Sequence, residues 1–175
     1  VLEKGTVGRP LACSGHVSLD LWDFVPERYH DDLFQNAIHG ARFHLGGSES
    51  KAYPFYTEEP ISNTIDRVRL DEVLAEVAGT AGADVRPGHT VTAVEEQSDR
   101  VLITASGPDG PEQFQSRMVV GADGPRSRVR SEVGLPEPSE FLHGVLGFEF
   151  EPDDQTFVDV HLTVPRFFAW RIPRG

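Results

Sequence analysis

The run from Met118 to Arg130, MVVGADGPRSRVR, constrains the fold more than any other part of the chain. Its apolar start predicts the end of a buried strand, and the small residues that follow leave room for a second backbone to approach closely. The Asp123-Gly124 turn then leads into a basic segment that predicts a short helix. Because the first N–H groups of a helix lack internal partners, this segment is a natural seat for a phosphate. The alternative is an ordinary strand–turn–helix in which Asp123 caps the helix.

Hydrophobic periodicity predicts strands and helices along the rest of the chain. Residues 68–82 carry apolar side chains at helical spacing, with Asp71 expected as dipole partner and cap, and Ser18 can cap a short helix over 19–24. Helix–strand alternation in the middle, with sheet at both ends, predicts a mixed α/β fold of two interleaved domains. Strands are expected at 1–5, 40–45, 52–56, 85, 91–94, 101–105 and 114–120, antiparallel sheet at 145–151, 156–163 and 167–172, and turns at 46–48 and 107–111.

The composition argues against several classes of function. A net charge of −12 disfavours nucleic acid as a partner, because binding phosphates requires an excess of basic residues. Lys4 and Lys51 are the only lysines, and acidic, lysine-poor surfaces are typical of halophilic proteins, so a halophilic archaeal source is expected; an ordinary acidic protein of a GC-rich organism is the alternative. Without a membrane-spanning stretch or secretory signal, the expected location is the cytoplasm. A single cysteine and scattered histidines predict neither a disulfide nor a metal site.

The Asp-Gly turn carries a resemblance to a known group of enzymes. With Ser127 three residues after the glycine and Arg130 three further on, the run resembles the second fingerprint of flavoprotein aromatic hydroxylases and their relatives. The resemblance implies part of a glutathione-reductase-like FAD/NAD(P)-binding fold of Rossmann type, with an antiparallel β-sheet substrate domain. The resemblance also implies that five residues lie near FAD and the nicotinamide nucleotide: Gly121, Asp123, Gly124, Ser127 and Arg130.

The same resemblance implies further cofactor contacts. Glu3 follows a strand, where a carboxylate accepts hydrogen bonds from the adenosine ribose. The Gly-rich phosphate loop expected roughly 20 residues before such an acid is not in the sequence, so the chain is expected to be an interior fragment. Arg67, in the run DRVRLDEVL, would reach the flavin pyrophosphate or ribityl chain, with Arg69 as the competing residue. Lys4 and Val91 complete the implied cofactor-binding set.

A second segment narrows the resemblance to one branch of these flavoproteins. Cys13-x-Gly15-x-x-Ser18 is similar to a pattern of the geranylgeranyl reductase family, whose loop lies close to the isoalloxazine and the lipid tunnel. This implies that Gly15 contacts substrate and that Cys13 is the candidate catalytic residue, either as a proton donor or only by shaping the pocket. The alternative from the residue type alone is a small buried cysteine.

A third segment near the end of the chain supports the same branch. Phe168-x-Trp170-x-Ile172-Pro173 is similar to the Tyr-x-Trp-x-Phe-Pro stretch that lines the family's substrate channel. The resemblance implies that Phe168, Trp170 and Pro173 bind the substrate, but a phenylalanine at the first position removes the tyrosine hydroxyl and any hydrogen bond it makes. The alternative is a strand with an aromatic core face.

Together these resemblances imply an FAD-dependent oxidoreductase that reduces isoprenoid double bonds of a prenylated lipid. FAD would receive electrons from NAD(P)H or a ferredoxin and pass hydride to the alkene, and peripheral membrane contact is expected from such a substrate. Residues 1–36 and 64–135 are expected in the FAD-binding domain, and 37–63 and 136–175 in the substrate-binding domain. The alternatives are an FAD-dependent monooxygenase or halogenase of the same fold, and a non-catalytic substrate-binding or interaction module.

Overall fold

The structure, a computed structural model, describes residues 1–11, 13–46, 51–150, 155–163 and 166–175. These residues divide into two compact units, one formed by 1–9 with 75–145 and the other by 10–74 with 146–175. Both contain strands and helices, which confirms the predicted mixed α/β class. The expected division into a cofactor domain and a substrate domain is a functional one that these units do not test, and it stays a prediction.

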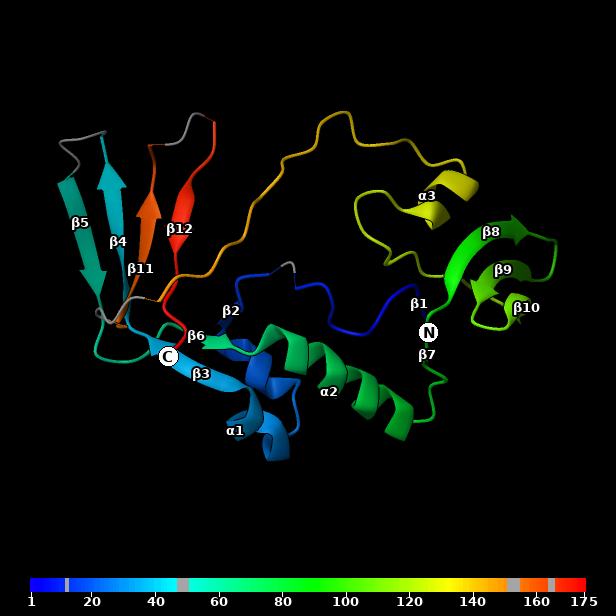
Figure 1. Cartoon of the computed structure of the whole chain (residues 1–175), viewed down its shortest axis with the longest axis horizontal. Helices are drawn as coiled ribbons and strands as arrows, with labels where there is room; N and C mark the ends of the chain where they lie inside the picture. The colour runs from blue at the N-terminus through cyan, green and yellow to red at the C-terminus, as the bar shows by residue number, and fades with distance from the viewer. Residues whose placement is uncertain (12, 47–50, 151–154, 164–165) are drawn as a thin grey trace. The chain divides into compact units, whose positions relative to one another are not determined.

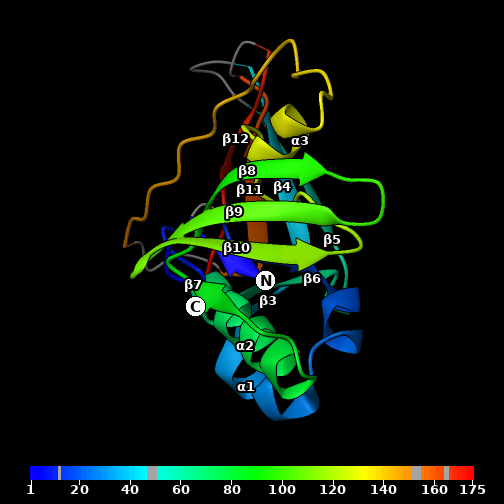
Figure 2. The same ribbon diagram turned by 90° about the vertical axis from the view of Figure 1, so that its right-hand side faces the viewer.

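The first unit is built on an antiparallel meander. Its strands β8 (Thr90–Glu96), β9 (Val101–Gly107) and β10 (Gly110–Ser116) lie side by side in the order β10–β9–β8 (Figure 2). Strands β1 (Leu2–Glu3) and β7 (Arg86–Pro87) form a separate parallel pair, and the short helix α3 (Arg128–Glu132) packs on β8. The core of the sheet is formed by the buried side chains of Val94, Ile103 and Ala105.

The strand expected at 114–120 is shorter than predicted. Strand β10 ends at Ser116, and the side chains of Met118 and Val120 are 77% and 80% exposed. Among the described residues no strand pairs with 118–120, so this segment has neither ladder hydrogen bonds nor burial to fix it as a strand. The prediction that a buried strand ends directly before the Asp-Gly turn is therefore wrong in this structure.

The second unit contains a four-stranded sheet. Strands β12 (Ala169–Arg171), β11 (Phe157–His161), β4 (Gly40–Leu45) and β5 (Lys51–Tyr56) lie side by side in that order (Figure 1). Strands β4 and β5 form the predicted antiparallel pair, while the turn residues 47 and 48 lie outside the described part of the chain. Strand β11 is antiparallel to β12, as predicted for 156–163 and 167–172, whereas its other neighbour, β4, runs parallel to it, so the sheet is mixed.

The strand expected at 145–151 is also absent. Residues 145–150 belong to no strand of the described part of the chain, and residue 151 lies outside it. Val145 is 92% exposed and Phe150 is fully exposed. Apolar residues alone do not make a strand, because the extended backbone needs a neighbouring strand to take up its hydrogen bonds.

A second sheet in this unit holds the deepest part of its core. Strand β6 (Ser62–Ile65) is buried along its whole length between β2 (His16–Ser18) and β3 (Phe34–Ile38). The 3-10 helices η1 (Leu19–Asp23) and η2 (Glu27–Tyr29) and the single turn α1 (His30–Leu33) connect β2 to β3, and Ser18 Oγ accepts from the Asp20 N–H as a cap. The fully buried apolar side chains are those of Leu33, Ile38, Ile65 and Val73.

Helix α2 (Arg67–Thr80) confirms the helix predicted at 68–82, with ends shifted by one or two residues. Asp66 Oδ1 accepts from the Arg69 N–H at 3.0 Å, so Asp66 caps the helix and the cap expected from Asp71 is not formed. Asp71 instead pairs with Arg67 one turn earlier on the helix surface.

Candidate functional site

The Asp123 carboxylate of the Asp-Gly fingerprint caps the N-terminus of the helix that follows it, α3. Oδ2 accepts from the N–H groups of Arg128 at 2.6 Å and Val129 at 3.2 Å, and Oδ1 accepts from Ser127 Oγ. Ser127 Oγ in turn accepts from the Arg130 N–H at 3.0 Å. Burial opposes ionisation, but the hydrogen bonds from Ser127 and the backbone hold the pKa of Asp123 below its ordinary value. The N–H groups expected to bind a phosphate are thus occupied internally, and the cap interpretation describes this geometry.

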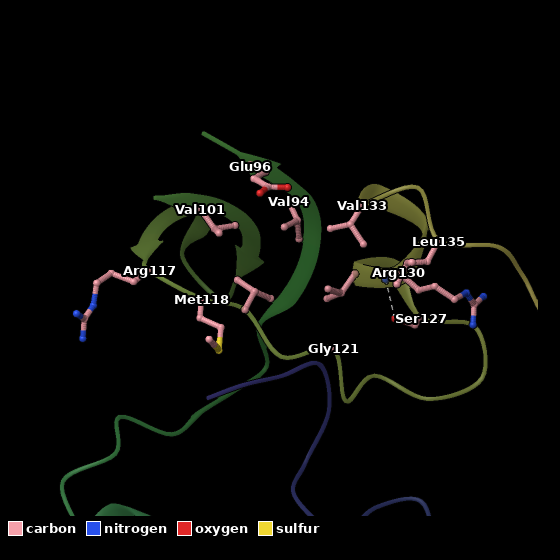
Figure 3. Close-up of a pocket in the computed structure, with 12 residues that line it drawn as sticks. Val94, Glu96, Val101, Arg117, Met118, Gly121, Ser127, Arg130, Val133 and Leu135 are labelled. Carbon is pink, nitrogen blue, oxygen red and sulfur yellow. Dashed lines mark hydrogen bonds between the residues drawn. The ribbon is translucent and has the colours of Figure 1, made fainter. Parts of the chain in front are cut away.

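A hollow of about 420 Å³ lies beside this fingerprint in the first unit (Figure 3). Val94 and Val101 line it from the meander and Val133 from the end of α3, and Gly121, Ser127 and Arg130 of the predicted cofactor set also border it. A Cβ at Gly121 would lie 2.9 Å from the Cβ of Val129, so packing against α3 requires glycine there. Gly124 has a φ of +84°, which the turn requires.

Arg130 borders the hollow and carries a buried donor that has no partner among the described residues. Its Nη1 donates to the Pro125 carbonyl oxygen at 2.9 Å, while its buried Nε–H has no hydrogen-bond partner among the described residues. A buried donor without a partner is costly, and an anionic oxygen at this position would remove the cost. The chemistry of this donor therefore fits a phosphate or another anionic part of a nucleotide.

Glu3 lies at the end of β1, as the sequence predicts. Its Oε1 accepts from the Gly5 N–H at 2.8 Å, and its Oε2 accepts no hydrogen bond from the described residues. A half-buried carboxylate with one uncommitted oxygen at a strand end is suited to bind ribose hydroxyls. The side chain of Lys4 is exposed beside it, and Val91 lies on β8. Cofactor contacts by these residues stay predictions.

The second unit brings Cys13 and Arg67 together at the start of α2. Arg67 Nη1 donates to Asp71 Oδ1 at 2.5 Å, and the guanidinium lies close enough to the Cys13 side chain for the two to interact electrostatically. Burial opposes its charge, but Asp71 and Cys13 keep the pKa of Arg67 above its ordinary value. The competing residue, Arg69, instead pairs with Asp32 at 3.4 Å and is turned to a different set of partners. The candidate catalytic thiol and the predicted flavin-binding guanidinium are therefore neighbours.

Gly15 is required by packing within the second unit. Its φ is +81°, and a Cβ there would lie 2.5 Å from the carbonyl oxygen of Ile65. Its own carbonyl accepts from the Ile65 N–H at 2.9 Å. The close approach that glycine permits is thus to β6, and the predicted contact of Gly15 with substrate is not tested.

The aromatic residues near the end of the chain form a cluster. The ring centroids of Phe168 and Trp170 lie 5.5 Å apart, and Phe167 stacks on Phe168 at 4.7 Å. Because alternate residues of a strand share a face, the register aligns Trp170 with Val160, Phe43 and Tyr53 across the four-stranded sheet. Phe43 is 39% exposed and Tyr53 is 52% exposed, so this face presents apolar surface. Pro173 follows β12, and its carbonyl accepts from Thr64 Oγ1.

The opposite face of the same sheet carries a polar cluster that the sequence analysis missed. Asp159, 5% exposed, accepts from Arg42 Nε at 2.8 Å and Nη2 at 2.9 Å and from His44 Nε2 at 2.8 Å. Burial alone would disfavour its charge, but these donors hold the pKa of Asp159 below its ordinary value. His44 also stacks on His161 with ring centroids 4.2 Å apart. Only the register of β4 against β11 reveals this cluster.

Within the described ranges, no group of three or more His, Cys, Asp and Glu side chains is arranged to hold a metal ion. The helices of that same part of the chain include none that is long and apolar enough to cross a membrane.

The chain belongs to the FAD-binding domain family, whose model matches residues 27–167. It is 34% identical over 61% of its length to 12-dehydrotetracycline 5-monooxygenase/anhydrotetracycline 6-monooxygenase of Streptomyces rimosus, of which it covers 21%. It is 26% identical over 97% of its length to digeranylgeranylglycerophospholipid reductase 2 of Methanothermobacter thermautotrophicus, of which it covers 46%. The chain thus spans between about a fifth and a half of these relatives.

The solved structures support the same fold. A geranylgeranyl bacteriochlorophyll reductase-like protein of Thermoplasma acidophilum matches 99% of this chain with a TM-score of 0.77 and 23% identity, over 47% of its own length. The predicted fold class, part of an FAD-binding fold shared with such reductase-like proteins, is therefore confirmed. The predicted halophilic archaeal source and the specific roles of the site residues stay predictions.

Proposed function

We propose that this chain binds the cofactor and substrate in an FAD-dependent oxidoreductase that saturates isoprenoid double bonds of a prenylated lipid. The observation that carries the proposal is the extent of similarity. The match to the archaeal digeranylgeranylglycerophospholipid reductase runs over 97% of the chain, whereas the match to the Streptomyces monooxygenase covers 61%. Peripheral contact with a membrane from the cytoplasm follows from such a substrate and belongs to the proposal.

The apolar face of the four-stranded sheet supports a long apolar substrate. Phe43, Tyr53, Phe55 and Trp170 share this face, and the first three are between 39% and 52% exposed. Covering such surface with an isoprenoid chain contributes roughly 25 cal/mol for each Å² of apolar area removed from water. Phe168 and Pro173 continue the apolar region beyond β12.

The donors and acceptors of the chain fit FAD. Among the described residues no donor contacts Glu3 Oε2 and no acceptor contacts the Nε–H of Arg130, so the first unit offers an acceptor suited to the adenosine ribose and a donor suited to an anionic oxygen. When bound, FAD supplies the hydride chemistry, and the protein contributes binding, orientation and exclusion of water.

Reduction of an alkene requires a hydride at one carbon and a proton at the other. In our proposal Cys13 donates that proton from Sγ, and Arg67, which lies beside the thiol, stabilises the thiolate left behind. Solvent then returns the proton to Cys13 before the next turnover. NAD(P)H or a reduced ferredoxin would restore the electrons.

We will find the proposal supported if bound reduced FAD is reoxidised when the protein is mixed anaerobically with a geranylgeranylated phospholipid. The lipid should gain two hydrogens per double bond. Cys13→Ala should slow this reoxidation by about 100-fold, the usual size of a general-acid contribution, with FAD binding retained. Stopped-flow absorbance of the flavin and mass spectrometry of the lipid measure both effects. An unchanged rate in Cys13→Ala would show that Cys13 only shapes the pocket.

The runner-up function is an FAD-dependent monooxygenase or halogenase. The identity of 34% to the tetracycline-pathway monooxygenase favours it, as does Phe168, where the reductase pattern has tyrosine. In the same experiment it predicts that the lipid is left unreduced and that reduced flavin reacts rapidly only when oxygen and an aromatic substrate are added. A non-catalytic module would show no saturable flavin binding at all.

A further inference from the structure

His89 is a buried histidine whose two ring nitrogens both face hydrogen-bond acceptors. It lies between β7 and β8 and is 9% exposed. Nδ1 is 2.9 Å from the Pro87 carbonyl oxygen, and Nε2 is 3.0 Å from Glu112 Oε1. A carbonyl oxygen only accepts, so Nδ1 carries a hydrogen. Glu112 Oε2 accepts from Arg86 Nη1 at 3.2 Å, as an ionised carboxylate does, so Nε2 donates as well. Both contacts are therefore satisfied together only when the ring carries a hydrogen on each nitrogen.

The charges around this ring come from three elements. Strand β10 contributes Glu112, and β7 contributes Arg86, which also pairs with Asp84 at 2.7 Å just before that strand. Strand β1 contributes Glu3, whose carboxylate is turned to the Gly5 N–H. The Glu112 carboxylate therefore lies between the Arg86 guanidinium and the His89 ring, Asp84 pairs with Arg86 on the other side, and Glu3 is turned away; Glu112 loses one of its two cationic partners when the ring becomes neutral.

The same residue anchors the end of β1. The main-chain N–H of His89 donates to the Glu3 carbonyl oxygen at 2.9 Å, and the Gly88 N–H donates to the Gly5 carbonyl at 3.2 Å. The ring lies beside Gly107 of β9, where an added Cβ would lie 2.9 Å from Nε2, so glycine leaves the space that the ring occupies. His89 therefore contacts Glu112 through its ring and the Glu3 backbone through its own main chain.

We propose that His89 is a positioning residue that holds Glu3 for the adenosine ribose by means of the proton between its ring and Glu112, so that cofactor affinity falls when that proton is lost. The inference rests on the proposed role of Glu3 in binding FAD. On deprotonation Nε2 becomes an acceptor that faces a carboxylate, and the contact turns repulsive. The stabilisation is present where the ring is charged and disappears as the pH rises.

Glu112→Gln keeps the contact with the His89 ring but removes its dependence on the proton of Nε2. In Glu112→Gln the side-chain amide can donate to a neutral Nε2, so the contact persists at every pH and its pH dependence vanishes. Glu95→Gln removes an exposed carboxylate from β8 and is the matched control. The first readout is nitrogen-15 NMR of the His89 ring together with the backbone amide of Glu3, followed across the pH range in both variants and the unaltered chain.

We expect the unaltered chain and Glu95→Gln to show a ring transition with the same midpoint as a change at the Glu3 amide, and Glu112→Gln to show a ring transition without a matching change at the Glu3 amide. A ring that carries one proton throughout, or a Glu3 amide that ignores the ring, would overturn the proposal. The second readout is the Kd for FAD, expected to rise about tenfold between about pH 6 and about pH 9 except in Glu112→Gln. If FAD does not bind at either pH, the proposed function of Glu3 fails, while the NMR result still decides whether His89 controls Glu3.

Discussion

Replacing Asp159 with alanine is expected to lower the free energy of unfolding by about 3–5 kcal/mol, the usual cost of removing one partner from a buried ion pair. The carboxylate is 5% exposed and accepts from both the Arg42 guanidinium and His44, so its loss leaves a charged group facing an empty position inside the sheet. Because these contacts join β4 to β11, the parallel pairing of those strands should weaken with it. Urea denaturation of the variant and the unaltered chain measures the difference.

Asp99→Ala provides the control, since Asp99 pairs with Arg100 at 3.1 Å on the surface, where both side chains are well exposed. That pair should be worth less than about 1 kcal/mol. Equal losses in the two variants would contradict the role assigned to Asp159.

The free energy of unfolding measured at acid pH is an independent test of the same contacts. The pKa of Asp159 is lowered in the folded chain, so its contribution is complete above the unfolded value of about 3.9 and is lost as the pH falls through the folded value.

Gly15→Ala should destabilise the chain by about 3 kcal/mol. A φ of +81° costs a residue with a Cβ about 1–2 kcal/mol, and the added methyl would lie 2.5 Å from the Ile65 carbonyl oxygen, a clash that adds a similar amount. The damage falls on the hydrogen bond between Gly15 and Ile65, which fixes the end of β6. Thermal and urea unfolding of the purified variant measure the loss.

Gly79→Ala is the matched substitution for comparison. Gly79 lies inside α2, and a Cβ there meets nothing within 4 Å. Alanine should therefore stabilise the chain by about 0.5–1 kcal/mol through its better helix propensity. If Gly15→Ala were as harmless as Gly79→Ala, the close approach to Ile65 would not be what requires glycine at that position.

Elements with local signals could be predicted from the sequence. Helix α2 could be predicted from the apolar spacing within a single segment. The cap that Ser18 forms on η1 could be predicted because Ser18 and its N–H partner, Asp20, are only two residues apart. The parallel pairing of β4 with β11 could not be predicted, since it joins residues about 115 positions apart and neither strand encodes its neighbour. The strand expected at 145–151 is not formed over the described residues 145–150 for the same reason, because apolar composition does not supply a partner.

In the candidate site, too, features with local signals could be predicted and features formed by distant segments could not. Glu3 lies at the end of a strand as expected, and Cys13 lies near Arg67, while the cofactor-binding and catalytic roles of these residues stay predictions. The cap formed by Asp123 was considered as the alternative, and the structure shows it. The Asp159 cluster and the two acceptors around His89 require side chains from strands that meet only in the folded chain. Such clusters cannot be predicted from residue types alone.

The most direct test of the account is a fluorescence titration of the chain with FAD and, in parallel, with FMN, which lacks the adenosine. If Glu3 binds the adenosine ribose, FAD should bind saturably and at least about tenfold more tightly than FMN, and Glu3→Gln should remove most of that preference. Equal affinity for the two flavins, or a preference that survives in Glu3→Gln, would contradict the assignment of this unit to FAD binding.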